Sequence, residues 1–308
     1  MRKVNIFLDT NVIEIQNKKL FEFKFNNVYG RLKRFITYNG YNNFKIIIPQ
    51  IVLDEIYKHY IEEYKNIQEK LDNLDDGYNS IKSDLVKVGY DINIIRNRYS
   101  NVKEYEDYLK SNFNKYILQE EGYMEILPYP SQDKFYSIIK RAIQKKRPFF
   151  FGGINNKKFS DAGFKDVVIL ESIKEKMEKE NSEYVIATND NIFNGLNWND
   201  EIKERKGKAT TAKRDTDIVD FICKEYNLRD LSEYIEFSRT EYFSEKVSNA
   251  LGKSIVRIEN AKFEECEDNN VVIIKCKLED GKNINVILDE TKEFINVANT
   301  SDEIIFQW

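Results

Sequence analysis

Residues 3–15 read KVNIFLDTNVIEI: the apolar run from Val4 to Leu8 ends at Asp9, and apolar residues resume only after Thr10 and Asn11. The run is nearly continuous rather than alternating, which is typical of a strand buried on both faces of a parallel sheet. In open parallel sheets the functional sites lie outside the carboxyl ends of the strands. The stretch therefore predicts an α/β fold that carries Asp9 at the carboxyl edge of its sheet.

The same alternation of strand and helix patterns continues along the chain. A second buried strand is expected at residues 44–48, a helix from 166 onward, and another strand at 184–187 that ends in Thr188, Asn189 and Asp190. Strands that alternate with helices indicate an α/β sandwich around a mostly parallel sheet. After Pro49, apolar residues recur at three- and four-residue steps, which predicts a helix that packs in the core or against another helix. These positions are Leu53, Ile56, Tyr60, Tyr64, Ile67, Leu71 and Leu74.

The length of 308 residues suggests one large domain and a smaller one. We expect the α/β domain at residues 1–235, with a helical insertion at about 62–145 where the sequence turns polar and helical. We expect a small unit of one helix and a β-meander at 236–308, because Asn269-Asn270 and Asp280-Gly281 mark turns between strand-like runs.

Charge and cysteine content exclude several classes of protein. Forty-eight basic and 52 acidic residues give a net charge of -4, which does not favour a protein that coats nucleic acid through bulk charge. The three cysteines, Cys223, Cys266 and Cys276, form no CxxC pair, so neither a disulfide framework nor a structural zinc site is expected. With no signal peptide or membrane span in the pattern, the expectation is a soluble, cytoplasmic protein.

Four acidic residues stand at equivalent places, after strands or at the start of the helices that follow them. They are Asp9, Glu55, Asp166 and Asp190. Because these places lie on one edge of a parallel sheet, the four side chains are predicted to converge. Gathered carboxylates repel one another unless a divalent cation balances them, and ligands that are all oxygen select Mg²⁺ or Mn²⁺. Metal-assisted hydrolysis of a phosphodiester is the chemistry that this pattern favours.

His59 is the one histidine of the chain, and no G-x-S-x-G motif accompanies it, which argues against a Ser-His-Asp device. It lies four residues after Glu55 and hence on the same helical face. Two interpretations stay open: His59 reaches the acidic site, or it is a surface or locally hydrogen-bonded imidazole, and we favour the second.

Four segments together resemble the PIN-domain nucleases, in their order and in their strand or helix context: IFLDTNVI (6–13), PQIVLDEI (49–56), GFKDVVILESI (163–173) and VIATNDNIF (185–193). The resemblance covers roughly residues 3–225. It implies a PIN-like three-layer sandwich and a metal-dependent ribonuclease that hydrolyses RNA. Endonucleolytic cleavage is our expectation, with exonucleolytic cleavage left open. The four acids would be catalytic metal ligands or hold water for the metal, and Asn11 and Thr188 would orient carboxylates or water. The long insertion and the added β unit resemble the larger PIN-like proteins rather than compact members.

A basic and aromatic stretch shortly before Asp166 is a candidate for contacting RNA, with single-stranded RNA as the first expectation and DNA left open as a substrate. It contains Lys140, Arg141, Lys145, Lys146, Arg147, Phe149, Phe150 and Phe151, and Lys165 follows it. Such a mix can track phosphates and stack bases. The alternative is a solvated helix face followed by core phenylalanines. A second basic run, 203–214, follows Asp190 and could form another wall of an RNA groove, but as an isolated run of charge it is interpreted as a loop. A homodimer through the insertion or the β-meander is a further expectation.

Two rival functions remain. An aspartyl phosphatase also begins with a strand that ends in aspartate, but it needs a second acid two residues later, where this chain has Asn11. A binding or scaffold protein could keep the acidic cluster as a polar pocket only. Cleavage of RNA that depends on the metal and on Asp9 separates the nuclease from both.

Overall fold

The structure is a computed structural model that describes residues 2–88, 101–149, 163–189, 193, 209–212, 217–265, 270–299 and 304–307. The chain divides into two compact units, one of residues 2–27 and 45–214 and the other of residues 28–44 and 215–308. The domain boundary at residue 235 stays a prediction.

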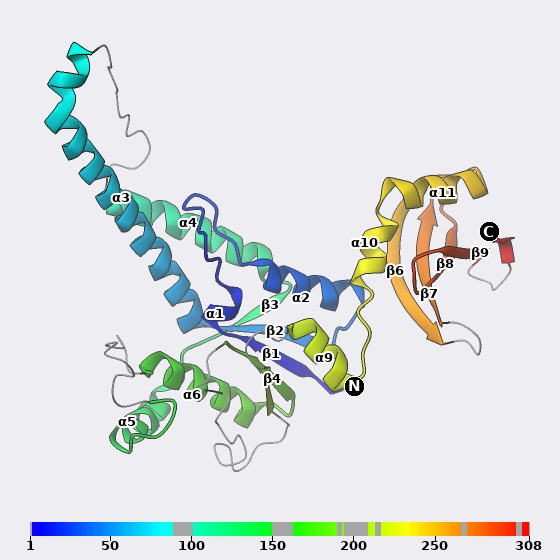
Figure 1. The fold of residues 1–308 in the computed structure, drawn as a ribbon. Helices are drawn as coiled ribbons and strands as arrows, with labels where there is room; N and C mark the ends of the chain where they lie inside the picture. The colour runs from blue at the N-terminus through cyan, green and yellow to red at the C-terminus, as the bar shows by residue number, and fades with distance from the viewer. Residues whose placement is uncertain are drawn as a thin grey trace. The chain divides into compact units, whose positions relative to one another are not determined.

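A five-stranded sheet forms the centre of the first unit (Figure 1). Its order is β3-β2-β1-β4-β5, so β1 has a neighbour on each side. The pairs β1·β4, β2·β3 and β4·β5 are parallel. The strands are β1 (Val4–Leu8), β2 (Phe44–Pro49), β3 (Met124–Leu127), β4 (Glu183–Ala187) and β5 (Ala209–Ala212). The predicted α/β class with a parallel central sheet is confirmed.

The register of the central strands determines what meets at the carboxyl edge. β1 pairs with β4 from Val4↔Glu183 to Leu8↔Ala187. Asp9 and Thr188 are the next residues of these two strands, so the pairing places them side by side. All five residues of β1 are buried, which explains why the strand is apolar almost throughout.

Two strands of this sheet were not predicted. β3 lies inside the expected helical insertion, and β5 lies inside the basic run 203–214 that was interpreted as a loop. Both have four residues and stand at the edges of the sheet. Edge strands are paired on one side only, and each of these two is only partly buried, so neither produces a long apolar run.

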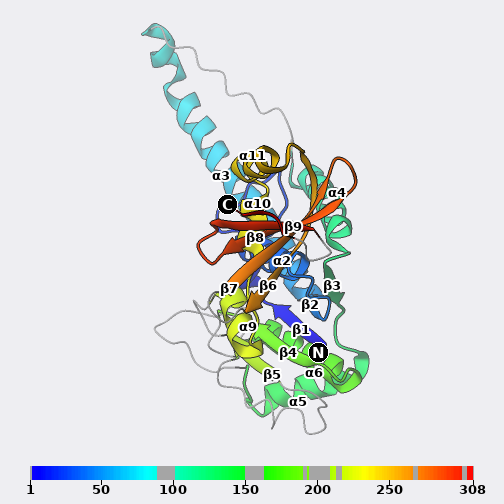
Figure 2. The ribbon, with the colours of Figure 1, turned by 90° about the vertical axis from the view of Figure 1, so that its right-hand side faces the viewer.

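Helices of this unit are α1 (Thr10–Ile13), α3 (Gln50–Lys87), α4 (Val102–Glu120), α5 (Phe135–Ile143) and α6 (Phe164–Lys179), with a 3₁₀ turn η1 at Gln132–Lys134. α4 packs along the first half of α3, where the rings of Tyr64 and Tyr105 stack with centroids 4.1 Å apart. α3 then continues well beyond α4 in both views (Figure 1, Figure 2). The packing expected for the apolar stripe of α3 is present up to Tyr64, whereas Leu74 is 62% exposed.

The second unit contains an antiparallel sheet of order β10-β9-β8-β7-β6, in which each strand pairs with its neighbour in sequence. The predicted β-meander is thereby confirmed. Its elements are α2 (Asn27–Tyr38), α9 (Ile218–Tyr226), α10 (Ser232–Ser238), α11 (Glu241–Leu251), β6 (Ile255–Glu265), β7 (Asn270–Leu278), β8 (Asn283–Asp289), β9 (Phe294–Asn299) and β10 (Ile304–Gln307). Phe243 and Val247 of α11 share one hydrophobic core with strand residues such as Ile274 and Val286.

The predicted turn at Asp280-Gly281 is present between β7 and β8. Gly281 has a φ of +81°, a left-handed conformation that glycine adopts without steric cost. The other predicted turn, Asn269-Asn270, lies partly outside the described residues. Within the part of the chain that the structure describes, no helix is both long and apolar enough to cross a membrane.

Candidate active site

Asp9 is held rigidly at the carboxyl edge of the sheet. It caps the N-terminus of α1, and its Oδ1 accepts a 2.7 Å hydrogen bond from the backbone N–H of Thr10. Its Oδ2 accepts a 2.7 Å hydrogen bond from the hydroxyl of Thr188. The side chain is buried, and this burial raises the pKa of Asp9 although Lys165 and both hydrogen bonds act to lower it. Ionised Asp9 is therefore costly unless positive charge lies nearby.

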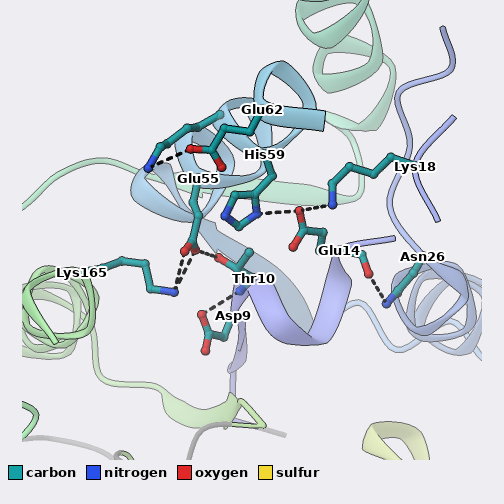
Figure 3. Close-up of polar contacts among 10 residues, drawn as sticks. Asp9, Thr10, Glu14, Lys18, Asn26, Glu55, His59, Glu62 and Lys165 are labelled. Carbon is teal, nitrogen blue, oxygen red and sulfur yellow. Dashed lines mark hydrogen bonds and ion pairs between the residues drawn. The ribbon is translucent and has the colours of Figure 1, made fainter. Parts of the chain in front are cut away.

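Glu55 reaches the same edge from the second turn of α3. Its Oε2 accepts a short hydrogen bond from the hydroxyl of Thr10, the residue that follows Asp9 (Figure 3). Thr10 therefore connects the two acids, through its backbone to Asp9 and through its side chain to Glu55. Asp9 and Glu55 thus both contact one residue, and their role as site residues stays a prediction.

Lys165 supplies positive charge to this group of acids. Its Nζ lies 2.8 Å from Oε2 and 3.1 Å from Oε1 of Glu55 (Figure 3). Burial by itself would lower the pKa of Lys165, but the charges of Asp9, Glu55 and Asp166 outweigh burial and raise it. The ammonium is thus fully protonated and in electrostatic contact with three of the four predicted acids.

Asp166 lies in the first turn of α6, directly after Lys165, and is buried. Gly163 precedes this helix with a φ of +82°, a conformation that favours glycine, and starts α6 so that Lys165 and Asp166 both lie in its first turn. An acid near a helix N-terminus is stabilised by the helix dipole. The fourth predicted acid, Asp190, lies outside the described residues. Among the described residues, no three His, Cys, Asp or Glu side chains lie close enough together to hold a metal ion.

The two predicted orienting residues make different contacts. Thr188 donates to Asp9, as expected of a residue that orients a carboxylate. Asn11 instead holds the turn after β4: its Oδ1 accepts from the backbone N–H of Asn189 at 2.9 Å, and its carbonyl accepts from the Asn189 side chain at 3.0 Å. Asn11 therefore joins the ends of β1 and β4, and the functional roles of both residues stay predictions.

A second charged group, formed by Glu14, Lys18 and His59, lies beside Glu55. The sequence analysis placed His59 on the same helical face as Glu55 but did not identify Glu14 or Lys18. The Nδ1 of His59 lies 2.8 Å from Oε1 of Glu14, and Lys18 Nζ lies 3.0 Å from the same oxygen (Figure 3). The hydrogen bond to Glu14 is the main cause that raises the pKa of His59. The favoured interpretation of His59, a locally hydrogen-bonded imidazole, agrees with this contact.

The basic stretch divides into exposed and buried parts. Lys145, Lys146 and Arg147 are exposed in the turn after α5. Arg141 is buried and lies 3.8 Å from Glu171, so it is not part of a nucleic-acid surface as the sequence suggested. Phe149 is 8% exposed and packs with Ile138, Val167 and Val168, which favours the core interpretation over base stacking for this ring. Phe150 and Phe151 lie outside the described residues.

The fold and the site define an α/β protein that gathers acidic side chains at the carboxyl edge of a parallel sheet. The sequence profile described as PIN domain matches residues 6–193, and the chain belongs to the PIN-domain family. The resemblance found in the four short segments is thereby confirmed. No curated protein matches the chain. PIN-domain proteins are generally nucleases that use divalent metals, so membership supports a nuclease as the coarse class of this protein.

Proposed function

We propose that this protein is an endoribonuclease that hydrolyses RNA phosphodiester bonds with Mg²⁺ or Mn²⁺. One observation carries the proposal: Asp9, Glu55 and Asp166 lie within electrostatic reach of a single ammonium group at the carboxyl edge of the sheet. Carboxylates gathered in this way destabilise the fold unless positive charge balances them, and such arrangements are typical of functional sites. Asp190 completes the proposed set.

The donor chemistry of these residues fits a hard divalent cation. Every candidate ligand is a carboxylate oxygen, with neither a thiol nor an imidazole among them, which favours Mg²⁺ or Mn²⁺ over Zn²⁺. The position beside Glu55 is already filled by a cationic group, the Lys165 ammonium. A bound cation would polarise a phosphodiester oxygen and lower the pKa of a water molecule.

The chain's own residues would position the acids before any cation binds. Thr188 and the Thr10 backbone hold the two oxygens of Asp9, and the Thr10 hydroxyl holds Glu55. These contacts come from the residue that follows β4, from α1 and from α3, so the carboxylates are held at the ends of rigid elements. Lys165 would balance their charge and, once released from Glu55, contact a phosphate of the RNA.

RNA as the substrate is supported by local rather than overall charge. Lys145, Lys146 and Arg147 are exposed in one turn, and positive side chains of this kind contact phosphates. Because the chain as a whole carries a net charge of -4, binding would be confined to such patches. Single-stranded RNA in the cytoplasm is the proposed target.

The experiment compares two neighbouring acids of α3. Glu55→Gln removes a charge that lies in the site, whereas Asp54→Asn removes the same charge from the adjacent residue, whose Oδ1 accepts a 2.7 Å hydrogen bond from Gln50 at the protein surface. With purified protein, labelled RNA and Mn²⁺, we expect Glu55→Gln and Asp9→Asn to abolish cleavage and Asp54→Asn to retain it. Equal loss in Glu55→Gln and Asp54→Asn would contradict the assigned site.

The choice of substrate discriminates the remaining alternatives. A circular single-stranded RNA is cut by an endonuclease but not by an exonuclease, and matched DNA and double-stranded RNA report on specificity. A protein that binds RNA and Mn²⁺ without cutting it would be the scaffold. Hydrolysis of para-nitrophenyl phosphate with intact RNA would identify the phosphatase.

A further inference from the structure

The apolar stripe of α3 has a seven-residue repeat that continues to Val88, the residue that caps the C-terminus of the helix. Beyond Ile67, apolar side chains follow at alternating steps of three and four, and we call this set the distal stripe. Its members are Leu71, Leu74, Tyr78, Ile81, Leu85 and Val88. An average spacing of 3.5 residues is the pattern of a helix that packs along another helix.

The first part of the same repeat shows what this face packs against. Tyr57, Tyr60 and Tyr64 precede the distal stripe in the same phase. Tyr64 stacks on Tyr105 of α4, and the hydroxyl of Tyr57 donates to the carbonyl of Glu106 at 3.1 Å. α4 starts at Val102, close to this stack, so the last 20 or so residues of α3, about 30 Å of helix, extend beyond it.

The distal stripe is exposed over much of this length. Leu74, Ile81 and Val88 are 62%, 50% and 68% exposed. Large aliphatic side chains gathered on one exposed face mark a surface that binds a partner. The repeat identifies the partner as another helix with the same spacing.

We propose that the distal stripe pairs with the distal stripe of a second copy of this chain, in an antiparallel coiled coil. Full overlap of residues 71–88 brings Leu71 opposite Val88, Leu74 opposite Leu85, and Tyr78 opposite Ile81 of the other copy. Every apolar position then faces an apolar position. The overlap is about 27 Å long.

The flanking charges are satisfied in this antiparallel register, as they are in a parallel pair where Lys70 lies opposite Asp75, and the position of α4 is what favours the antiparallel arrangement. Asp75 and Lys82 occupy equivalent positions beside the stripe, one repeat apart. In the antiparallel register Asp75 of each copy lies opposite Lys82 of the other, which gives two attractive pairs and no repulsive pair. In a parallel pair the two α4 helices would both lie at the N-terminal end of the paired stripes and on the same face, so they would crowd each other.

The first experiment measures the mass of the full chain by sedimentation between 1 and 100 μM, concentrations on the order of those where specific protein pairs form. We expect a dimer of twice the 36.6 kDa chain. Leu74→Glu/Ile81→Glu should weaken it at least about a hundredfold, because charges replace apolar contacts at the seam. The matched control Asn73→Glu/Ser80→Glu adds the same charges to adjacent exposed positions and should remain dimeric.

Two outcomes of this experiment would overturn the proposal. One is a wild-type chain that stays monomeric at every concentration measured, which would mean that the distal stripe binds a different protein. The other is a dimer that survives Leu74→Glu/Ile81→Glu, which would locate the contact elsewhere. Circular dichroism of the variants confirms that the helix content is kept.

A second experiment tests the orientation by exchanging charges. Asp75→Lys alone and Lys82→Asp alone each place like charges opposite one another in the antiparallel register, so each variant should dimerise at least about tenfold more weakly. An equimolar mixture should recover a heterodimer, because every flanking pair is then attractive. In a parallel pair the mixture would keep a repulsion between Lys70 of one copy and the lysine that Asp75→Lys introduces in the other. Failure to recover the heterodimer would therefore overturn the antiparallel arrangement.

Discussion

Replacing Lys165 by methionine should make the protein bind divalent cations more tightly. The Lys165 ammonium lies 2.8 Å and 3.1 Å from the two oxygens of Glu55 and is attracted by Asp9 and Asp166. A cation that binds these carboxylates must displace the ammonium and then tolerate it nearby. Methionine has a similar length and fills the space without charge. The variant therefore has neither an ion pair to break nor a repulsion between the ammonium and the bound cation.

The size of the effect follows from Coulomb's law. Charges of +2 and +1 separated by about 8 Å, with an effective dielectric constant of about 20, repel by about 4 kcal/mol. The Lys165 side chain is 21% exposed, so water screens part of this repulsion. Taking half of the value leaves about 2 kcal/mol, which is roughly a thirtyfold lower Kd.

The measurement is calorimetric titration of metal-free protein with Mn²⁺, which needs no substrate and no turnover. Lys179→Met is the matched control, since it removes the same charge from the same helix at an exposed pair with Glu175. We expect Lys165→Met to bind Mn²⁺ about thirtyfold more tightly and Lys179→Met to bind like the wild type. An unchanged or weaker affinity in Lys165→Met would refute the view that the ammonium competes with the metal.

Three further predictions concern stability. His59→Gln should lower the melting temperature most below about pH 6.5, the usual pKa of histidine. The reason is that the pKa of His59 is raised, so protonated His59 stabilises the fold. The difference in melting temperature between variant and wild type should shrink as pH rises through the raised pKa, and a difference that grows with pH would contradict this. Phe149→Ala should reduce the free energy of unfolding in urea by about 3–5 kcal/mol, because its buried ring packs in the core; a loss below about 1 kcal/mol would indicate an exposed ring. Asp9→Ala and Asp166→Ala should abolish RNA cleavage while the metal-free proteins melt near the wild-type temperature, because the cost of burying these two charged side chains offsets the contacts that they make. A large drop in melting temperature would count against this.

The central strands and the family could be predicted from the sequence alone. β1, β2 and β4 lie in the interior of the sheet, so burial on both faces requires nearly continuous apolar residues, which are visible in sequence. β3 and β5 are short edge strands with partly exposed side chains, and their four-residue runs carry little signal. Asp9 and Glu55 were also predictable, because topology alone places the ends of strands and the starts of the following helices at one edge.

The partners of the charged side chains became visible only in the folded protein. Lys165 precedes Asp166 in sequence, and nothing in its neighbourhood along the chain shows that its ammonium binds Glu55, 110 residues away; its predicted contact with RNA stays a prediction. Glu14 and His59 likewise form a pair across 45 residues. Strand and helix patterns depend on neighbouring residues and can be read locally, whereas an ion pair depends on how rigid elements pack, and no local pattern encodes that distance.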